Sequence, residues 1–206
     1  MGVFVISSMI RRISLVLLGV SIAMAVFVFT ATAVRAFLFA PDTEIEVSQT
    51  NESSHTTAQY PVRLRIPVIG VDTDIQEVGV NGKGNMAVPS NYTDTGWYKY
   101  GPAPGESGSA VIAGHVNNGL GLSGVFEHLG DLEVGDDIYI ERADGKTVHF
   151  VVTGSRVYPY TDAPAEVIFN PTGSVRLNLI TCEGKWVKED KTYDQRLVVF
   201  TKLANE

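Results

Sequence analysis

The chain contains a single cysteine, Cys182, which directly follows the mostly apolar run Leu177–Thr181. A thiolate attacks carbonyl carbons, but a free thiol with a pKa of about 8.5 is mostly protonated at neutral pH and needs a basic or cationic neighbour. His115 supplies an imidazole, which takes the thiol proton and returns it to a leaving amine. Arg196 supplies a guanidinium, which stays charged and stabilises the oxyanion of a tetrahedral intermediate. These residue types predict acyl transfer at a cysteine nucleophile.

A single cysteine excludes an intrachain disulfide, so packing must hold the domain together. A lone cysteine is also a common buried core residue, and composition alone leaves that alternative open for Cys182. The other three histidines are predicted to be non-catalytic, because His55 lies in a polar stretch, His128 in a surface turn and His149 on the outward side of a strand. The sequence predicts no metal site and no cofactor.

Short strands must position the three reactive residues. From Pro61 onward, β-branched and aromatic runs alternate with turn residues, which is typical of an all-β domain. Two alternating runs flank the Asp144-Gly145 turn, the strongest hairpin signal in the chain. We expect strands at Val62–Ile66, Val71–Val78, Ser109–Ala113, Asp137–Arg142, Lys146–Val152, Val175–Thr181 and Arg196–Leu203, with Cys182 and Arg196 at strand ends.

The segments between these strands are predicted to be irregular. Residues 81–100 are expected to form a loop, Gly124–Leu129 one helical turn and Ala163–Phe169 a short helix. Seven or eight short strands, with no βαβ alternation and no internal repeat, indicate a closed β-barrel or a sandwich. Closure into a barrel also removes exposed sheet edges.

An uncharged stretch of 22 residues, 13–34, precedes the domain. As a helix it is long enough to cross a hydrocarbon core of about 30 Å. Arg11 and Arg12 flank its N-terminal end and acids follow its C-terminal end, so the positive-inside rule places residues 1–12 in the cytoplasm. A cleaved signal peptide is the alternative, because the Ala-Thr-Ala sequence at 31–33 resembles a cleavage site. Either outcome exports the remainder, and the length favours an uncleaved single-pass anchor.

The expected organisation is therefore a cytoplasmic N-terminus (1–12), a transmembrane helix (13–34), a polar linker (35–60) and an extracellular catalytic domain (61–206). The first 40 residues carry three arginines and no acid, so residues 41–206 carry a formal charge of −10 (−7 minus +3). An acidic domain without a clustered basic stripe excludes nucleic acid as a partner.

Three motifs give the domain a resemblance to the sortase family: the AGH sequence at 113–115, the LITC sequence at 179–182, and an arginine 14 residues after the cysteine. The resemblance covers the chain from about Pro61 to its end. It implies an eight-stranded β-barrel in which the strands bearing His115, Cys182 and Arg196 converge on one groove. Runs such as VFEHLGDLEVGD and ADGKTVHFVV most resemble the class F and class E sortases of Gram-positive bacteria.

By this resemblance, Cys182 attacks the peptide bond of an LPXTG-type sorting motif in a secreted protein, usually after its Thr, and forms a thioester. An amine of a peptidoglycan precursor or a pilin then resolves the thioester into a new amide bond. Thr181 is expected to contact the substrate, since it stands beside the cysteine. Asn178 departs from the family pattern, which commonly has Thr at that position. The calcium sites known in some members have no visible counterpart in this sequence.

Two other classes of function remain as alternatives. A different cell-wall cysteine enzyme fits less well, because an L,D-transpeptidase-like protein would place its cysteine after a Ser-x-Gly run and an NlpC/P60-like peptidase would place it before the histidine. A catalytically inactive β-barrel that binds ligands on a membrane stalk is the other alternative. The complete set of His115, Cys182 and Arg196 favours catalysis over a binding module.

Overall fold

The structure is a computed structural model that describes residues 17–28, 59–118, 122–170 and 172–204. The chain divides into two compact units, Met1–Phe39 and Ala40–Glu206. In the first unit, residues 17–28 form a helix. Within the described parts of the chain, no helix is both long and apolar enough to span a membrane. The remainder of the predicted transmembrane segment 13–34 and nearly all of the linker 35–60 lie outside the described residues.

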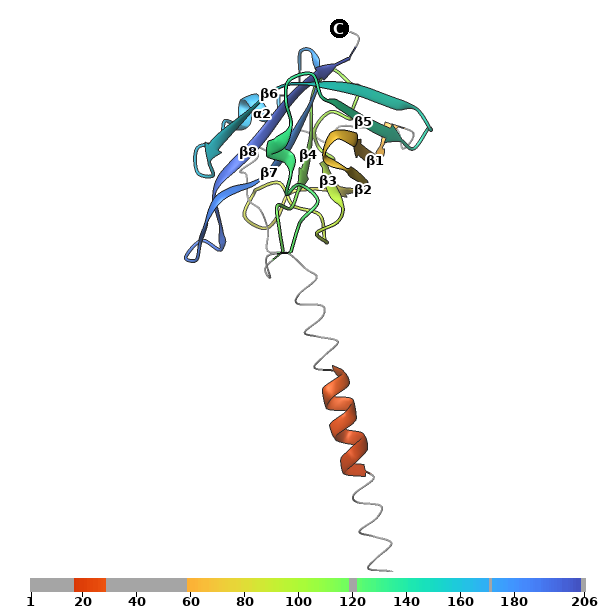
Figure 1. The fold of residues 1–206 in the computed structure, drawn as a ribbon, viewed down its shortest axis with the longest axis vertical. Coiled ribbons are helices and arrows are strands. Elements are labelled where there is room, and N and C mark those ends of the chain that lie inside the picture. Colours follow the sequence, from red (N-terminus) through yellow and green to blue (C-terminus); the bar gives the residue numbers. More distant parts are fainter. Residues whose placement is uncertain (1–16, 29–58, 119–121, 171, 205–206) are drawn as a thin grey trace, which may run out of the picture. The chain divides into compact units, whose positions relative to one another are not determined.

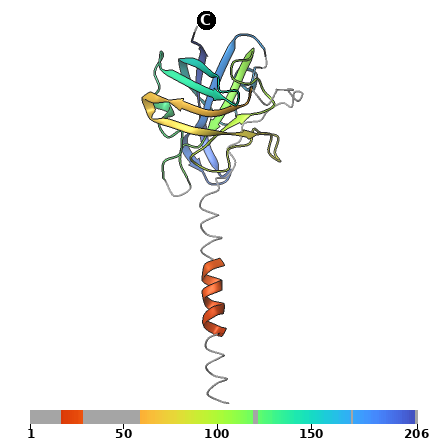
Figure 2. The same ribbon diagram turned by 90° about the vertical axis from the view of Figure 1, so that its right-hand side faces the viewer.

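The second unit is a closed barrel of eight strands in the order β1-β2-β3-β4-β7-β8-β6-β5, and pairing of β5 with β1 closes it. Two pairings, β2 with β3 and β4 with β7, are parallel. Figures 1 and 2 show the strands wrapping around a common interior. The strands are β1 (Pro61–Ile66), β2 (Val71–Val78), β3 (Thr95–Tyr98), β4 (Gly108–Gly114), β5 (Asp137–Arg142), β6 (Thr147–Pro159), β7 (Val175–Val187) and β8 (Thr192–Leu203), with short helices η2 (Pro67–Ile69), η3 (Leu129–Asp131) and α2 (Ala165–Ile168).

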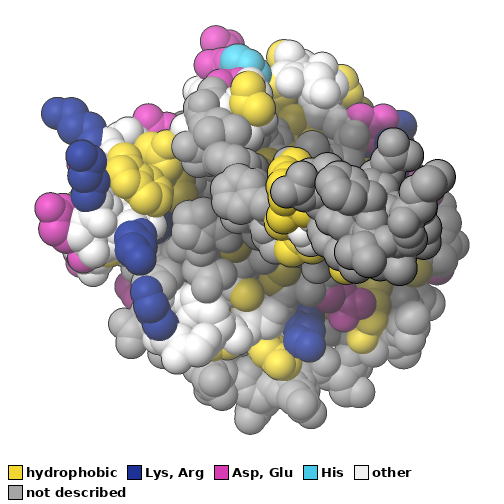
Figure 3. Space-filling view, turned by 90° about the horizontal axis from the view of Figure 1, so that it is seen from below, with side chains coloured by type: hydrophobic (Ala, Val, Ile, Leu, Met, Phe, Trp, Pro, Cys, Tyr) yellow, Lys and Arg dark blue, Asp and Glu magenta, His cyan; other side chains and the backbone are white. Residues whose placement is uncertain are grey.

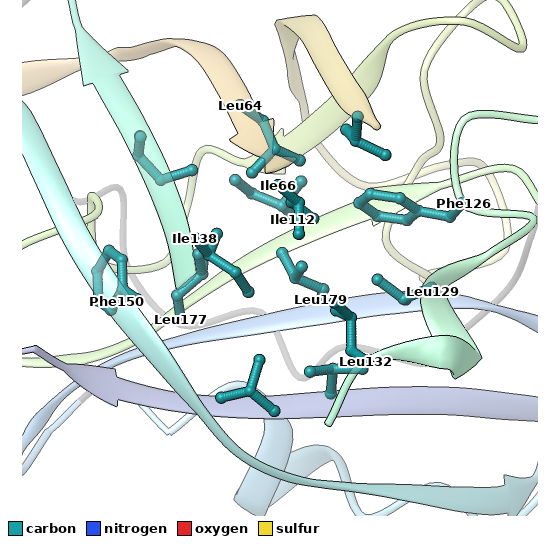
Figure 4. Packing of buried hydrophobic residues seen from close by; sticks show 14 of the residues in the cluster. Leu64, Ile66, Ile112, Phe126, Leu129, Leu132, Ile138, Phe150, Leu177 and Leu179 are labelled. Atoms are coloured by element: carbon teal, nitrogen blue, oxygen red, sulfur yellow. The ribbon is translucent and has the colours of Figure 1, made fainter. Parts of the chain in front are cut away.

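Apolar side chains fill the barrel interior. Because successive residues of a strand point to opposite faces, alternate positions such as Leu177 and Leu179 of β7 face inward together. Figure 4 shows them meeting side chains from the opposite strands and Phe126 from the segment before η3. Burying one such side chain contributes roughly 1.5–3 kcal/mol. This interior cluster fixes the register of each strand, and therefore fixes which residues point outward.

A second apolar cluster covers the outer face of β4, β7 and β8. It includes Ala113, Ile180 and Val198 from the three strands, and Ile168 of α2. The Asn178 side-chain amide donates to the Ile168 carbonyl oxygen at 2.7 Å and ties α2 to β7. The residue that departs from the family pattern therefore holds the covering helix against the sheet.

The barrel confirms most of the predicted strands and the short helix at 165–168, but three predictions were wrong. β3 lies within residues 81–100, which were expected to form a loop; it has only four residues and is surrounded by turn-forming ones. The predicted helical turn at Gly124–Leu129 is instead a turn followed by η3. β6 continues past its expected end at Val152, and β7 and β8 continue past theirs as a hairpin, so Cys182 and Arg196 lie inside strands.

Candidate active site

Two of the three predicted catalytic residues lie on adjacent strands, and the third, His115, directly follows the next strand, β4. Cys182 of β7 stands opposite Arg196 of β8 in the antiparallel ladder. β4 and β7 pair in parallel with Ala113 opposite Ile180, and continuing this register by two residues brings His115 level with Cys182. Neighbouring strands are about 4.8 Å apart. The sheet therefore brings together residues that are 67 and 14 positions apart in the sequence.

All three side chains also belong to the same face of the sheet. Ala113, Ile180 and Val198 lie in the outer apolar cluster, and each is two residues from His115, Cys182 or Arg196. Period-2 alternation therefore directs the three reactive side chains to the outer face, away from the barrel interior. Their exposed fractions are 6% for His115, 7% for Cys182 and 0% for Arg196. The site is largely shielded from water, which strengthens electrostatic interactions within it.

The guanidinium of Arg196 is held by the hairpin that carries it. Its Nη1 donates to the backbone oxygens of Tyr193 (2.9 Å) and Gln195 (2.8 Å), and its Nη2 donates to the Thr192 hydroxyl (2.7 Å). The Tyr160 ring lies beneath it, with the guanidinium carbon 5.6 Å from the ring centroid. These acceptors are neutral oxygens, so they orient the cation without cancelling its charge. A buried and oriented cation of this kind stabilises a developing oxyanion.

His115 is oriented by residues of the segment before β3. Its Nε2 lies 3.2 Å from the Pro89 backbone oxygen, and its ring packs against the Tyr92 ring with centroids 4.9 Å apart. A carbonyl oxygen only accepts, so this contact assigns the hydrogen of the neutral ring to Nε2 and leaves Nδ1 as the basic nitrogen. The ring is thereby fixed in orientation and tautomer.

Thr181 is directed to the opposite side from Cys182. Its side chain is buried, and its hydroxyl donates to the Gly114 backbone oxygen at 2.9 Å. This bond joins residues that directly precede Cys182 and His115 in the sequence. Through this bond Thr181 connects the strand of Cys182 to the end of the strand that precedes His115. Its predicted contact with the substrate stays a prediction.

Sequence reasoning missed the residues that orient the site. Pro89 and Tyr92 lie in a stretch predicted to be loop, and Tyr160, Thr192 and Tyr193 lie near strand ends that were placed wrongly. No local pattern marks a carbonyl or hydroxyl as an acceptor for a distant side chain. Of the histidines predicted to be non-catalytic, His128 is exposed and lies 3.1 Å from Asp131, and the partly exposed His149 stacks on Tyr139 with ring centroids 4.5 Å apart.

Tyr98 and Asp144, outside the three candidate catalytic residues, have shifted pKa values. Burial raises the pKa of Tyr98, which packs in the outer apolar cluster, and the nearby Tyr100 raises it further. The carboxylate of Asp144, at the tip of the β5–β6 hairpin, has its pKa lowered chiefly by the hydrogen bond from Arg142. In the part of the chain that the structure describes, no group of three or more His, Cys, Asp or Glu side chains is arranged to hold a metal ion.

Comparison with known families agrees with this architecture. The sortase-domain family model matches residues 64–204, and the chain therefore belongs to the sortase family. No curated protein sequence matches the chain.

Several solved sortases share the fold. Sortase A from Corynebacterium diphtheriae is 22% identical, with a TM-score of 0.54 over 70% of this chain and 60% of that one. Sortase C1 of GBS pilus island 1 is 24% identical, with a TM-score of 0.52 over 69% and 63%. Sortase C-1 from Actinomyces oris is 25% identical, with a TM-score of 0.52 over 70% and 74%. The chain spans about three fifths of the length of the first two. The resemblance to classes F and E stays a prediction.

Proposed function

We propose that the protein is a cysteine transpeptidase that cleaves an LPXTG-type sorting motif and transfers the attached protein to an amine of the cell wall or a pilin. The observation that carries the proposal is the pairing of Cys182 with Arg196 on β7 and β8, with His115 directly after β4, whose parallel register with β7 leads toward Cys182. An imidazole, a thiol and a guanidinium at these positions provide the base, the nucleophile and the oxyanion stabiliser that acyl transfer at a thiol needs.

In this mechanism, His115 takes the proton of the Cys182 thiol and the sulfur attacks the carbonyl carbon of the scissile bond. The oxyanion of the tetrahedral intermediate lies against the Arg196 guanidinium. The carbon–nitrogen bond breaks, His115 returns the proton to the leaving amine, and a thioester remains. An acceptor amine then attacks the thioester carbonyl and gives a proton to His115, the carbon–sulfur bond breaks, and His115 passes this proton to the leaving sulfur, which restores the Cys182 thiol.

The hydrophobic stretch 13–34 supports a location at the cell membrane, with the catalytic domain outside. In this arrangement the substrates are exported proteins that carry a sorting motif, and the acceptor is a peptidoglycan precursor or a pilin lysine. The same stretch would keep the enzyme at the surface from which its substrates emerge.

Mass spectrometry of the full-length chain tests the proposal. With a panel of LPXTG-type peptides, we expect a covalent adduct on the one cysteine of the chain, with the mass of the peptide's N-terminal part. Adding an amine should convert this adduct into an amide product. Cys182→Ala should abolish both species while circular dichroism shows an intact fold, because the smaller side chain removes only the sulfur.

The opposite result favours a catalytically inactive binding module. Across the peptide panel, such a module would give neither the adduct nor the amide product, and Cys182→Ala would not change its binding of the peptides. An unfolded Cys182→Ala variant would show instead that the cysteine is a structural core residue.

A further inference from the structure

The loop that follows His115 is folded back on itself. Phe126 N donates to the His115 oxygen at 2.9 Å, and Gly124 N donates to the Val116 oxygen at 3.0 Å. Asn117 forms an isolated bridge with Ser123. A side chain at Gly124 would overlap the backbone of His115, so glycine permits this close return. Asn117 therefore has a backbone position that is fixed relative to His115, two residues away.

The side chain of Asn117 reaches across to the β7–β8 hairpin. The Tyr193 hydroxyl of β8 lies 2.7 Å from Asn117 Nδ2 and 3.0 Å from Asn117 Oδ1. A hydroxyl both donates and accepts, so either orientation of the amide gives a hydrogen bond. The bond joins residues 76 positions apart in the sequence, and neither strand ladder supplies this connection.

Tyr193 has two further contacts on the hairpin. Its backbone oxygen accepts from Arg196 Nη1 at 2.9 Å. Its ring packs edge to face against Trp186 of β7, with centroids 5.4 Å apart and an interplanar angle of 76°. One residue therefore contacts the guanidinium through its backbone, the opposite strand through its ring and the His115 loop through its hydroxyl.

The hairpin needs such an anchor because it extends past the barrel. Figure 1 shows β7 and β8 projecting beyond the other strands. Beyond Cys182 the ladder is interrupted by a register shift between Glu183 and Trp186. Trp186 is 46% exposed, and the three lysines nearby are exposed as well. Figure 3 shows Lys and Arg side chains grouped on one side of the molecule beside hydrophobic ones. Packing alone holds such a segment weakly.

We propose that Tyr193 and Asn117 form a latch that fixes the separation between the Arg196 guanidinium and the His115 imidazole. The latch rests on the proposed function, since it matters for turnover only if these two groups act on one substrate. Both are positioning residues: neither touches the reacting atoms, and each acts through a neighbour. Small losses of alignment at a reacting centre reduce the rate strongly, whereas substrate binding depends on many other contacts.

The test compares Tyr193→Phe, Asn117→Ala and the double variant in the full-length chain. With a sorting-motif peptide and an amine, each single variant should lose about tenfold in kcat while KM changes less than about twofold. The double variant should be no slower than the single ones, because both changes break the same hydrogen bond. Tyr139→Phe, a hydroxyl deletion on β5, is the matched control and should keep full activity.

The rate at which iodoacetamide alkylates Cys182 as a function of pH gives a second measurement. The chain has one cysteine, so the reagent reports only this thiol. Loosening the imidazole and the guanidinium around the thiolate should raise the midpoint of the profile by about half a pH unit in both single variants. A role confined to stability would lower the melting temperature and leave this midpoint unchanged.

The two measurements separate the latch from the proposed function. If the wild-type chain gives no adduct with any peptide of the panel, the proposed function fails, and the alkylation midpoints still decide the latch. If the wild type turns over and Tyr193→Phe matches it in kcat and in alkylation midpoint, the latch is wrong and the proposed function stands. Losses that add up in the double variant would also overturn the latch.

Discussion

Two antiparallel hairpins of the barrel, β5–β6 and β7–β8, differ in character. The β5–β6 hairpin turns tightly at Asp144-Gly145, and the ion pairs at its tip stay within the hairpin, with Arg142 and Lys146 both directed to the Asp144 carboxylate. The β7–β8 hairpin carries Cys182 and Arg196, and its contacts reach outward to other segments. The tip of the first hairpin is tied together by its own side chains, whereas the second holds two of the candidate catalytic residues and is also tied to other segments.

The two hairpins each contain an arginine, and the contacts of Arg142 differ from those of Arg196 in the same way. Arg142 makes a hydrogen-bonded ion pair with Asp144, and the two side chains are 15% and 19% exposed. Arg196 is fully buried, and its guanidinium donates hydrogen bonds to the Thr192 hydroxyl and to the backbone oxygens of Tyr193 and Gln195. One cation lies against a carboxylate, and the other is held in orientation by hydroxyl and backbone oxygens.

Replacing each arginine by lysine gives the largest expected contrast. Arg196→Lys keeps the charge but loses the planar fork that Thr192 and the two carbonyls hold, so kcat/KM should fall about a hundredfold. Arg142→Lys should leave kcat/KM unchanged. Steady-state kinetics of both variants with one peptide substrate measure the contrast. Near-normal kinetics for Arg196→Lys would remove Arg196 from the oxyanion role.

A glycine in each hairpin gives the next contrast. Gly184 (φ +85°) and Gly145 (φ +76°) both have left-handed backbones. An added methyl group at Gly145 meets open space, while at Gly184 it would overlap the Asp194 carboxylate, which accepts a hydrogen bond from Lys185 N. Gly145→Ala should cost about 1 kcal/mol of unfolding free energy from backbone strain alone. Gly184→Ala should cost about 2 kcal/mol or more, because overlap adds to strain.

Urea unfolding of the two alanine variants measures these losses. Gly184→Ala should also lower kcat, because Asp194 lies two residues from Arg196, whereas Gly145→Ala should not. Equal losses of stability in the two variants would show that the β7–β8 hairpin rearranges freely around the new methyl group.

The same contrast separates what the sequence could predict from what it could not. The β5–β6 hairpin follows from local patterns, since alternating runs flank an Asp-Gly turn. The β7–β8 hairpin has Glu183, Gly184 and Lys185 where alternation should continue, and a register shift lies between Glu183 and Trp186. The motifs identified Cys182 and His115, but their alignment depends on the parallel pairing of β4 with β7, which two intervening strands separate in the chain.

The residues that orient the site were not predictable for a related reason. Thr192 is an ordinary strand residue in sequence, and only the folded hairpin places its hydroxyl 2.7 Å from Arg196 Nη2. Pro89 contributes a backbone oxygen, which every residue has. Local sequence records side-chain types, whereas these contacts are set by the tertiary structure.

Thr192→Val tests whether that hydroxyl orients Arg196. The valine is nearly isosteric but leaves a buried guanidinium donor without this acceptor, so kcat should fall about tenfold. Thr192→Ser keeps the oxygen and should restore most of the activity. Both variants should unfold at similar urea concentrations. If the serine variant is as slow as the valine variant, the loss comes from packing of the methyl group rather than from the hydrogen bond.

The smallest effect is expected at the tip of the β5–β6 hairpin. The hydrogen bond from Arg142 is the main cause of the lowered pKa of Asp144, and the Lys146 backbone N–H lowers it further against the opposing effect of burial. A carboxyl whose pKa is lower in the folded state stabilises the fold at pH values above its unfolded pKa, 3.8, and this contribution is lost as the pH falls through the native pKa.

Asp144→Asn should therefore melt slightly below the wild type at neutral pH, and the melting temperatures of the two proteins should converge in acid. Catalytic activity at neutral pH should not change, since none of the contacts described for Asp144 reaches the β7–β8 hairpin. A difference in melting temperature that persists well below pH 3.8 would show that the charge of Asp144 does not stabilise this hairpin.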